Sequence, residues 1–289
     1  MLFRWDWLRP VLTAPVVPTL GPVHPHALTV DLFEATLVAA ATDRHFLPYD
    51  KDRRWGTKKQ EAVLPEDVVH HPDYTLIPTL WTRGRGAVKV FAYGHRTDVL
   101  DQAAELAVKL AAVHGVGTAR VVRPLGPETS RPCGVRIQLQ DFTARHCPAS
   151  VGPVRRLDDW PAHIRGTFTT FAQTMAGDGF VFLDRQMKAK ECGTVFVAVL
   201  EGHVAGAIGP MEIRPDPTGV AQLMPQYFAV HPKARGHGLG RHLWRAAMHW
   251  GQTHGATYQL LQTEVGGASD HLCRTEGLTT LGFVHTSTV

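Results

Sequence analysis

The hydrophobic positions along this chain change between a period of two and a period near 3.6, and each change marks an element. Four segments of its first half are rich in β-branched and aromatic side chains and are bounded by glycine or charged residues, which predicts strands. They are residues 74–81, 87–94, 119–126 and 134–142. Between them, residues 97–115 carry apolar side chains at helical spacing. Thr97 can cap this helix and Gly115 can end it.

The second half of the chain shows the same alternation of periods. Residues 154–173 predict a short strand and then a helix with Pro161 in its first turn. Residues 194–200 and 204–213 flank a Glu-Gly-His turn as a hairpin. The remaining elements are expected at 221–230 (strand), 239–254 (helix), 258–265 (strand), 268–277 (helix) and 283–287 (strand). Strands and helices mixed in this way indicate the α/β class, with a mixed sheet.

The length of 289 residues suits two domains, since one domain averages about 150 residues. Residues 1–25 are rich in proline and predict an extended arm, whose aromatic and apolar residues suit docking on another surface. A linker at 144–153 then separates a domain at 26–147 from a domain at 152–289. The strand–strand–helix–strand order of the first domain resembles that of the second. It is either a degenerate copy of the same fold or an unrelated α+β accessory domain.

Composition narrows the classes of partner. The chain is 44% hydrophobic and 19% charged, with a net charge of +4, which suits an anionic ligand without requiring nucleic acid. The charged run at 50–61 has acids on both flanks, and we interpret it as a solvated loop. Four cysteines without CxxC spacing favour a reducing, cytoplasmic setting. No apolar run reaches about 18 residues, and the seventeen histidines form no HExxH motif, so neither a membrane span nor a metal is expected.

The candidate chemistry lies in the stretch ARGHGLG, residues 234–240, between a predicted strand and a predicted helix. A helix N-terminus presents free N–H groups and a partial positive charge. Glycines let these amides approach phosphate oxygens closely. The candidate pyrophosphate cradle comprises Arg235, Gly236, His237, Gly238, Leu239, Gly240 and Arg241.

Two common phosphate loops fit this stretch poorly. The GxxxxGK[ST] pattern of a P-loop is absent. A dinucleotide fold needs G-x-G-x-x-G directly after its strand, whereas residues 231–235 separate G-x-G-x-G from the strand here. Glu264 does mimic the ribose-binding acid of that fold. A further alternative is a glycine-rich turn that only allows close packing of strand and helix.

The run Arg235–Gly240 fits [QR]-x-x-G-x-[GA], follows a strand ending FAVHP, and precedes LQTEV and the terminal Leu281-Gly282-Phe283. This order resembles the GNAT superfamily of acyl-CoA-dependent N-acyltransferases over about residues 152–289. The resemblance implies acetyl-CoA as co-substrate, with its pyrophosphate on the amides of 236–241. It also implies a thioester in a V-shaped gap between two strands. Backbone groups of Phe228, Ala229 and Val230 would bind the pantetheine, and Ser269 falls at a family asparagine position.

The catalytic pattern departs from the family. Acyl transfer to an amine needs a base, an oxyanion donor and a proton for the leaving thiolate. The family tyrosine that supplies this proton is missing from SDHLCRTEGLTTLGF. Counting forward from the strand places Glu276 at its position, and counting back from Gly282 places Leu278 there. Glu276, Cys273 and water therefore all remain open as proton sources.

The base is expected to be Glu264, because it ends the strand beside the implied gap. Glu212 and His231 are the alternatives, although Glu212 also suits an ion pair and His231 a turn. Tyr227 suits a pocket wall or the core better than proton donation.

The function implied is acetyl-CoA-dependent N-acetylation of a small-molecule amine, by direct transfer in a ternary complex. A non-catalytic acyl-CoA sensor and an aminoacyl-tRNA-dependent transferase are the alternatives. The first half has no glycine loop of its own, so one cofactor per chain is expected. A homodimer is compatible with this reading, and a nucleic-acid partner is disfavoured.

Overall fold

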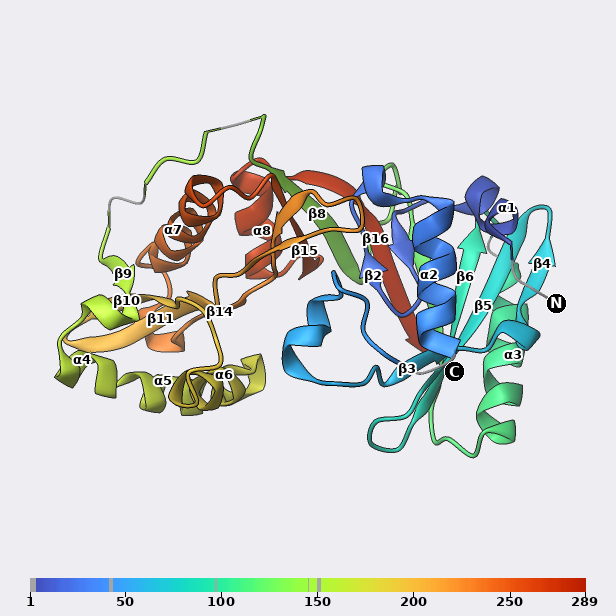
Figure 1. Cartoon of the computed structure of the whole chain (residues 1–289), viewed down its shortest axis with the longest axis horizontal. Coiled ribbons are helices and arrows are strands. Elements are labelled where there is room, and N and C mark those ends of the chain that lie inside the picture. Colours follow the sequence, from blue (N-terminus) through green and yellow to red (C-terminus); the bar gives the residue numbers. More distant parts are fainter. Residues whose placement is uncertain (1–3, 42–43, 97, 145, 150–151) are drawn as a thin grey trace. The chain divides into compact units, whose positions relative to one another are not determined.

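The computed structural model describes residues 4–41, 44–96, 98–144, 146–149 and 152–289 (Figure 1). The chain forms two compact units. The first unit comprises Met1–Leu139 and Leu260–Val289, and the second comprises Gln140–Gln259. The expected boundary near 147–152 therefore differs from the observed division, because the last thirty residues group with the first half of the chain.

The first unit is built on a mixed sheet, which confirms the α/β class. Its strands are β3 (Glu61–Val63), β4 (Val69–His71), β5 (Tyr74–Trp81), β6 (Ala87–Gly94), β7 (Ala119–Leu125), β16 (Thr279–Thr288) and most of β8 (Val135–Asp141) and β15 (Tyr258–Glu264), whose residues 140–141 and 258–259 belong to the second unit. They follow the order β15-β8-β16-β7-β6-β5-β3, and β4 also pairs with β5. Strand β16 lies between β7 and β8, antiparallel to both, which explains why the C-terminal residues belong to this unit. Strands β6 and β7 are parallel.

The helices of the first unit are α1 (Trp5–Leu8), α2 (Val30–Ala41), α3 (Val99–Val113) and α8 (Ala268–Thr275). The apolar face of α3 packs on Val88 and Val90 of β6, whereas Phe91 and Tyr93 enter a separate core on the opposite face. Gly115 ends the α3 segment at a left-handed φ of +62°, as expected. The expected cap Thr97 lies outside the described residues.

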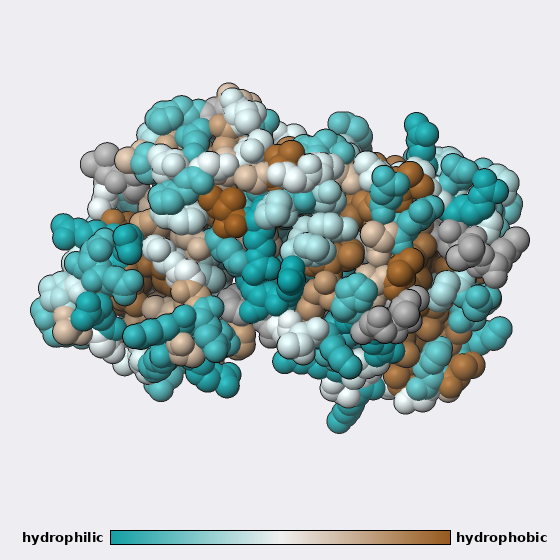
Figure 2. Space-filling model, in the orientation of Figure 1, coloured by the Kyte–Doolittle hydropathy of each residue, from teal (hydrophilic) through white to brown (hydrophobic). Residues whose placement is uncertain are grey.

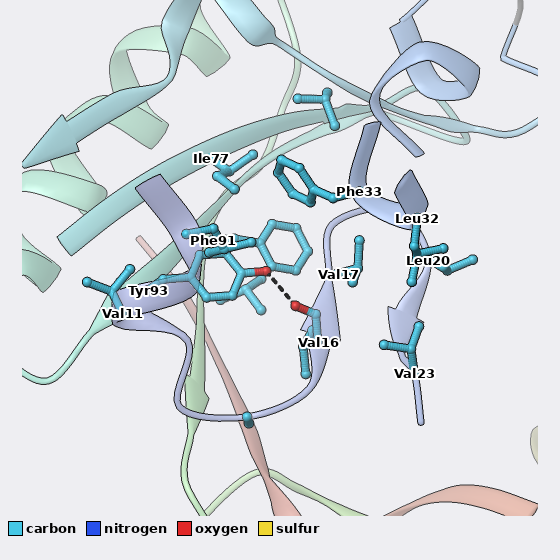
Figure 3. Packing of buried hydrophobic residues seen from close by; sticks show 14 of the residues in the cluster. Val11, Val16, Val17, Leu20, Val23, Leu32, Phe33, Ile77, Phe91 and Tyr93 are labelled. Atoms are coloured by element: carbon cyan, nitrogen blue, oxygen red, sulfur yellow. Dashed lines mark hydrogen bonds between the residues drawn. The ribbon is translucent and has the colours of Figure 1, made fainter. Parts of the chain in front are cut away.

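Residues 4–25 do not form the extended arm expected from their prolines. They contain α1 and the short hairpin of β1 (Val16–Val17) and β2 (Gly21–Pro22), and their apolar side chains enter the core. Figure 3 shows the hydroxyl of Tyr93 donating a hydrogen bond of 3.0 Å to the carbonyl of Val16. The prolines interrupt regular structure, but the apolar residues between them still gain stability from burial.

The second unit has a four-stranded antiparallel sheet of order β14-β11-β10-β9. Its strands are β9 (Val154–Arg156), β10 (Phe196–Leu200), β11 (His203–Gly209) and β14 (Tyr227–Val230), and its helices are α4 (Ala162–Gly166), α5 (Phe168–Thr174), α6 (Phe180–Lys188) and α7 (Leu239–Thr253). Pro161 is the N-cap of α4, one residue before the expected position. Ala207 packs with α5 and α6, and its neighbour Gly206 faces α7. Since successive strand residues face opposite sides, these helices cover both faces of the sheet.

The expected linker also has defined contacts. The N–H of Cys147 donates to Gln252 Oε1 over 2.8 Å, and the ring Nδ1 of His249 lies 2.8 Å from the Cys147 carbonyl oxygen. Both partners lie on α7. On the face drawn in Figure 2, hydrophobic side chains reach the surface as separate patches among hydrophilic ones. In the described part of the chain, no helix is long and apolar enough to cross a membrane.

Candidate cofactor site at the start of helix α7

The expected strand at 221–230 is two strands that belong to different sheets. Strand β13 (Ala221–Leu223) pairs with β12 (Ile213–Pro215) and, in parallel, with the first residues of β15. After the turn at 224–226, the chain continues as β14 and pairs with β11 instead. Pro225 has no N–H to donate to a ladder, which favours the break there. Strand β14 is consequently an edge strand of its sheet.

The free edge of β14 presents backbone groups of alternate residues. The N–H of His231 donates to Ala205 O over 2.8 Å, and Ala229 lies opposite Ala207. Antiparallel pairs alternate between bonded and non-bonded, so Phe228 and Val230 direct their N–H and C=O groups away from β11. An extended ligand with amide groups can pair with such an edge.

A short turn leads from β14 to the glycines. His231 caps η7 (Pro232–Ala234) by accepting the Lys233 N–H at Nδ1 over 3.2 Å. Arg235 is exposed, and its Nε donates to Val230 O over 3.4 Å. His231 therefore acts as a turn residue, which was its simpler interpretation.

Gly236 and Gly238 adopt left-handed backbone conformations, with φ of +85° and +75°. A Cβ atom at Gly236 would meet no heavy atom within 4 Å, and one at Gly238 only a ring atom of His242 at 4.0 Å. The glycines are thus required by the backbone and face open space, as a loop that receives a ligand should.

The first turn of α7 offers hydrogen-bond donors to that space. Gly238 is the N-cap and has no side chain to cap the helix, and the first turn contains no acid. The N–H groups of Arg241 and His242 donate to Gly238 O over 3.1 and 3.2 Å, whereas those of Leu239 and Gly240 have no partner among the described residues. Free donors at the positive end of a helix favour an anion.

The third glycine has a different role. A Cβ at Gly240 would lie 3.6 Å from side-chain atoms of Phe228 and Val230. One at Gly206 would lie 2.9 Å from Leu243. Close packing of α7 on the sheet, the simpler interpretation of the motif, therefore accounts for Gly240 and Gly206 but not for Gly236 or Gly238.

The expected catalytic residues belong to the first unit, whereas the glycine loop belongs to the second. Glu264 is exposed at the end of β15. Glu276 is half-buried at the C-cap of α8, and Ser269 is half-buried in the first turn of that helix. Burial raises the pKa of the Cys273 thiol to about 12, with the carboxylates of Asp270 and Glu276 adding to the shift. Cys273 is also only 2% exposed, so it is a poor proton source for a bound ligand.

Two other candidates have structural roles. Glu212 accepts a hydrogen bond of 2.5 Å from Arg214 Nε, the ion pair that its sequence context suggested. The ring of Tyr227 lies against Gly179, where a Cβ would come within 2.5 Å of it, and packs beside Phe180. Tyr227 is therefore a wall of the core of the second unit.

A buried polar network beneath α8 was not among the sites expected from the sequence. Asp270 is 1% exposed and accepts hydrogen bonds from Arg136 Nε (2.6 Å), Gln138 Nε2 (3.3 Å), Thr263 Oγ1 (3.2 Å) and the Gly266 N–H (3.1 Å). It ties the helix that carries Ser269 to β8 and β15. A signal was present, because polar residues alternate along β8 and so face one side of the sheet.

Residues 159–274 match the acetyltransferase (GNAT) family model. A GCN5-related N-acetyltransferase from Sphaerobacter thermophilus is 14% identical with a TM-score of 0.47, covering 75% of this chain and 80% of that one. A GCN5-related N-acetyltransferase from Kribbella flavida is also 14% identical, with a TM-score of 0.44, and the match covers 76% of this chain and 87% of that one. A tandem GNAT protein from the clavulanic acid biosynthesis pathway is 14% identical with a TM-score of 0.45, and the match covers 88% of this chain and 93% of that one. No curated protein sequence matches the chain.

Proposed function

We propose that this protein transfers an acetyl group from coenzyme A to the amine of a small molecule, on the premise that residues 159–274 match the acetyltransferase (GNAT) family model. The observation that carries the proposal is the glycine loop. Two left-handed glycines face open space directly before the uncapped N-terminus of α7. Their amides and the free N–H groups of the first turn suit a pyrophosphate.

The residues of the second unit fit coenzyme A along its length. Arg235 and Arg241 are exposed on either side of the loop and add positive charge for the phosphates. The outward backbone groups of Phe228 and the outward N–H of Val230 suit the amides of the pantetheine arm. When bound, the cofactor supplies an acyl thioester as the donor. In the part of the chain that the structure describes, no cluster of acids, histidines and cysteines could hold a metal.

The proposed proton chemistry involves two groups. An alkylamine titrates near 10 and is protonated at pH 7, so a base must accept its proton before or during attack. We assign this role to Glu264, whose side chain is exposed at the end of β15. A thiol titrates near 8.5, so the coenzyme A thiolate leaves with little help, and water or Glu276 supplies its proton.

The experiment that tests the function measures free thiol released from acetyl-CoA, with and without a panel of amines. Amine-dependent release with matching N-acetylated product supports direct transfer. If the protein binds acetyl-CoA but releases no free thiol with any amine of the panel, it is a non-catalytic sensor and the proposal is wrong. Transfer from aminoacyl-tRNA but not from acetyl-CoA would replace it with the tRNA-dependent reaction.

Glu264→Gln is expected to slow acyl transfer about 100-fold near pH 7, the lower end of the range for loss of a general base. The rate should recover toward that of the parent near pH 10, where the amine is already neutral. The measurement is kcat as a function of pH with one accepted amine. Glu105→Gln, at an exposed carboxylate on α3, is the matched control and should follow the parent throughout.

Glu276→Gln and Cys273→Ala complete this comparison. Neither should reproduce the pH-dependent recovery of Glu264→Gln. If all of the variants match the parent at every pH, Glu264 is not the base, and the acceptor or water removes the proton.

A further inference from the structure

Two adjoining cavities lie in the first unit, away from any role assigned so far. One has a volume of about 340 Å³ and is bounded by the β5–β6 turn and the start of β7. The other has a volume of about 280 Å³ and lies beside the β1–β2 hairpin. Lys89 of β6 and Arg120 of β7 line both of them. Each volume is close to the lower limit of about 300 Å³ for small-molecule pockets.

The larger cavity is lined by positive charge alone. Its charged lining residues are Arg83, Arg85, Lys89 and Arg120, and no carboxylate is among its lining residues. Lys89 is balanced, since its Nζ lies 3.2 Å from Glu61 Oε1 and 4.7 Å from the ring centre of Trp81. The three arginines have no carboxylate partner among the residues that the structure describes.

The turn that carries two of these arginines is held in place. The Thr82 N–H donates to Gln60 O over 2.8 Å, and the Arg85 carbonyl accepts the Gly117 N–H over 3.3 Å. Gly86 has a left-handed φ of +71°, and a Cβ there would come within 2.6 Å of Val116. The backbone of residues 82–86 is therefore fixed on both sides, which lowers the entropy lost when the arginines bind a ligand.

The smaller cavity offers mixed polar groups next to this positive region. Its polar lining residues are Thr19, Thr286 and Gln262, the acids Asp52 and Glu61, and the cations Lys51, Lys89 and Arg120. Glu61 is held by a 2.6 Å hydrogen bond from Thr79 Oγ1. Such a mixed lining suits the hydroxyl and amine groups of a polar molecule.

We propose that the two cavities together bind a small molecule that carries a phosphate group, with Arg83, Arg85 and Arg120 as its cationic ligands and its polar body in the smaller cavity. Guanidinium groups match phosphate oxygens in a bidentate geometry, which favours phosphate over a monovalent anion. The site goes beyond the proposed acyl transfer, because it uses none of the residues assigned to coenzyme A.

The start of α3 does not compete for this ligand. It follows β6 as α7 follows β14, but an exposed carboxylate occupies its N-cap. Asp98 accepts a 3.0 Å hydrogen bond from Arg96 Nε, and Asp101 adds a second acid to the first turn. Negative charge at this end of a helix disfavours a phosphate.

The test uses inorganic pyrophosphate as the probe, titrated calorimetrically at low ionic strength. The parent protein is expected to bind two equivalents, one at the glycine loop and one in the arginine-lined cavity. Arg120→Glu should weaken the second site at least tenfold and leave the first unchanged, and Gly238→Val should do the reverse. Lys109→Glu is the matched control, since Lys109 is exposed on α3 and lines neither cavity, and it should retain both sites.

Trp81 supplies a second readout, because its ring lines the larger cavity. Pyrophosphate should change the tryptophan fluorescence of the parent, and Trp81→Phe should remove that change while calorimetry still detects binding. If Arg120→Glu fails to fold, Arg85→Glu tests the same site at an exposed side chain.

Three outcomes overturn the proposal. The first is a second site whose affinity neither arginine variant changes. The second is a parent protein that binds pyrophosphate only at the glycine loop. The third is a single-stranded RNA that displaces pyrophosphate from the cavity with a steep salt dependence, which would assign the arginines to a polynucleotide. A parent protein that binds pyrophosphate only in the arginine-lined cavity would instead contradict the proposed acyl transfer and leave this inference standing.

Discussion

Replacing Gly238 with valine is expected to weaken coenzyme A binding at least 100-fold while the protein remains folded. A branched side chain at this position would occupy the open space in front of the α7 amides. It would also resist the φ of +75° that aims them at the ligand. Hydrogen bonds to a charged group contribute about 1.5–3 kcal/mol each, so losing two of them costs about 3–6 kcal/mol. Calorimetry with coenzyme A measures the loss.

Gly255→Val is the control for this substitution. Gly255 has a φ of +88° and open space around it, and it follows the other end of α7, about 22 Å away along a helix of 15 residues. The Gly255→Val substitution introduces the same backbone strain but should leave the affinity for coenzyme A unchanged. The parent should bind one tight equivalent per chain. An equal loss in both variants would mean that strain, and not the loop, governs binding.

The cofactor loop could be predicted from the sequence because its determinants are local. Glycines at fixed offsets between a strand and an amphipathic helix constrain the backbone whatever surrounds them. The strands β5 and β6 begin and end at the residues expected, and α7 begins at Leu239 as expected. These elements have strong periodicity and clear end signals, which tertiary contacts did not override.

The failures come from contacts between distant segments. The run at 50–61 was interpreted as solvated, but Asp50 and Lys59 form a 2.6 Å ion pair, with both side chains less than 5% exposed. Nothing in the local pattern indicates which charge is buried, because the partner segments that cover it lie elsewhere in the chain. For the same reason, the break at 224–226 was missed, since only the pairing of β13 and β14 with different strands reveals it.

The expected domain bounds follow the order of the chain, and the pairing of β16 departs from that order. The final strand follows the glycine loop in sequence, yet it pairs with β7 and β8. Whether the first half is a degenerate copy stays a prediction. Its β6, α3 and β7 follow the order strand, helix, parallel strand.

The buried network beneath α8 is expected to make a large contribution to the stability of the first unit. Asp270→Asn removes the charge that compensates Arg136, whose side chain is 10% exposed, and leaves a buried cation without its partner. Removing one member of a buried ion pair typically costs about 3–5 kcal/mol. The melting temperature should therefore fall by roughly 6–20 °C. Asp98→Asn, at the exposed pair with Arg96, is the control and should change little.

The pH dependence of this effect has a definite sign. Burial alone raises the pKa of Asp270, but hydrogen bonds from Arg136 and the Gly266 amide outweigh it and hold the pKa below the usual value for an aspartate. As the pH falls, the unfolded chain, with an aspartate pKa near 3.9, takes up the proton first. The stabilisation is then fully present above about pH 5 and is lost as the pH falls toward the folded pKa.

Melting temperatures of the parent and Asp270→Asn should therefore converge as the pH is lowered from 6 to 3. A constant difference between parent and Asp270→Asn across this range would show that shape, and not charge, makes Asp270 important. In that case the helix that carries Ser269 is held by packing rather than by the carboxylate.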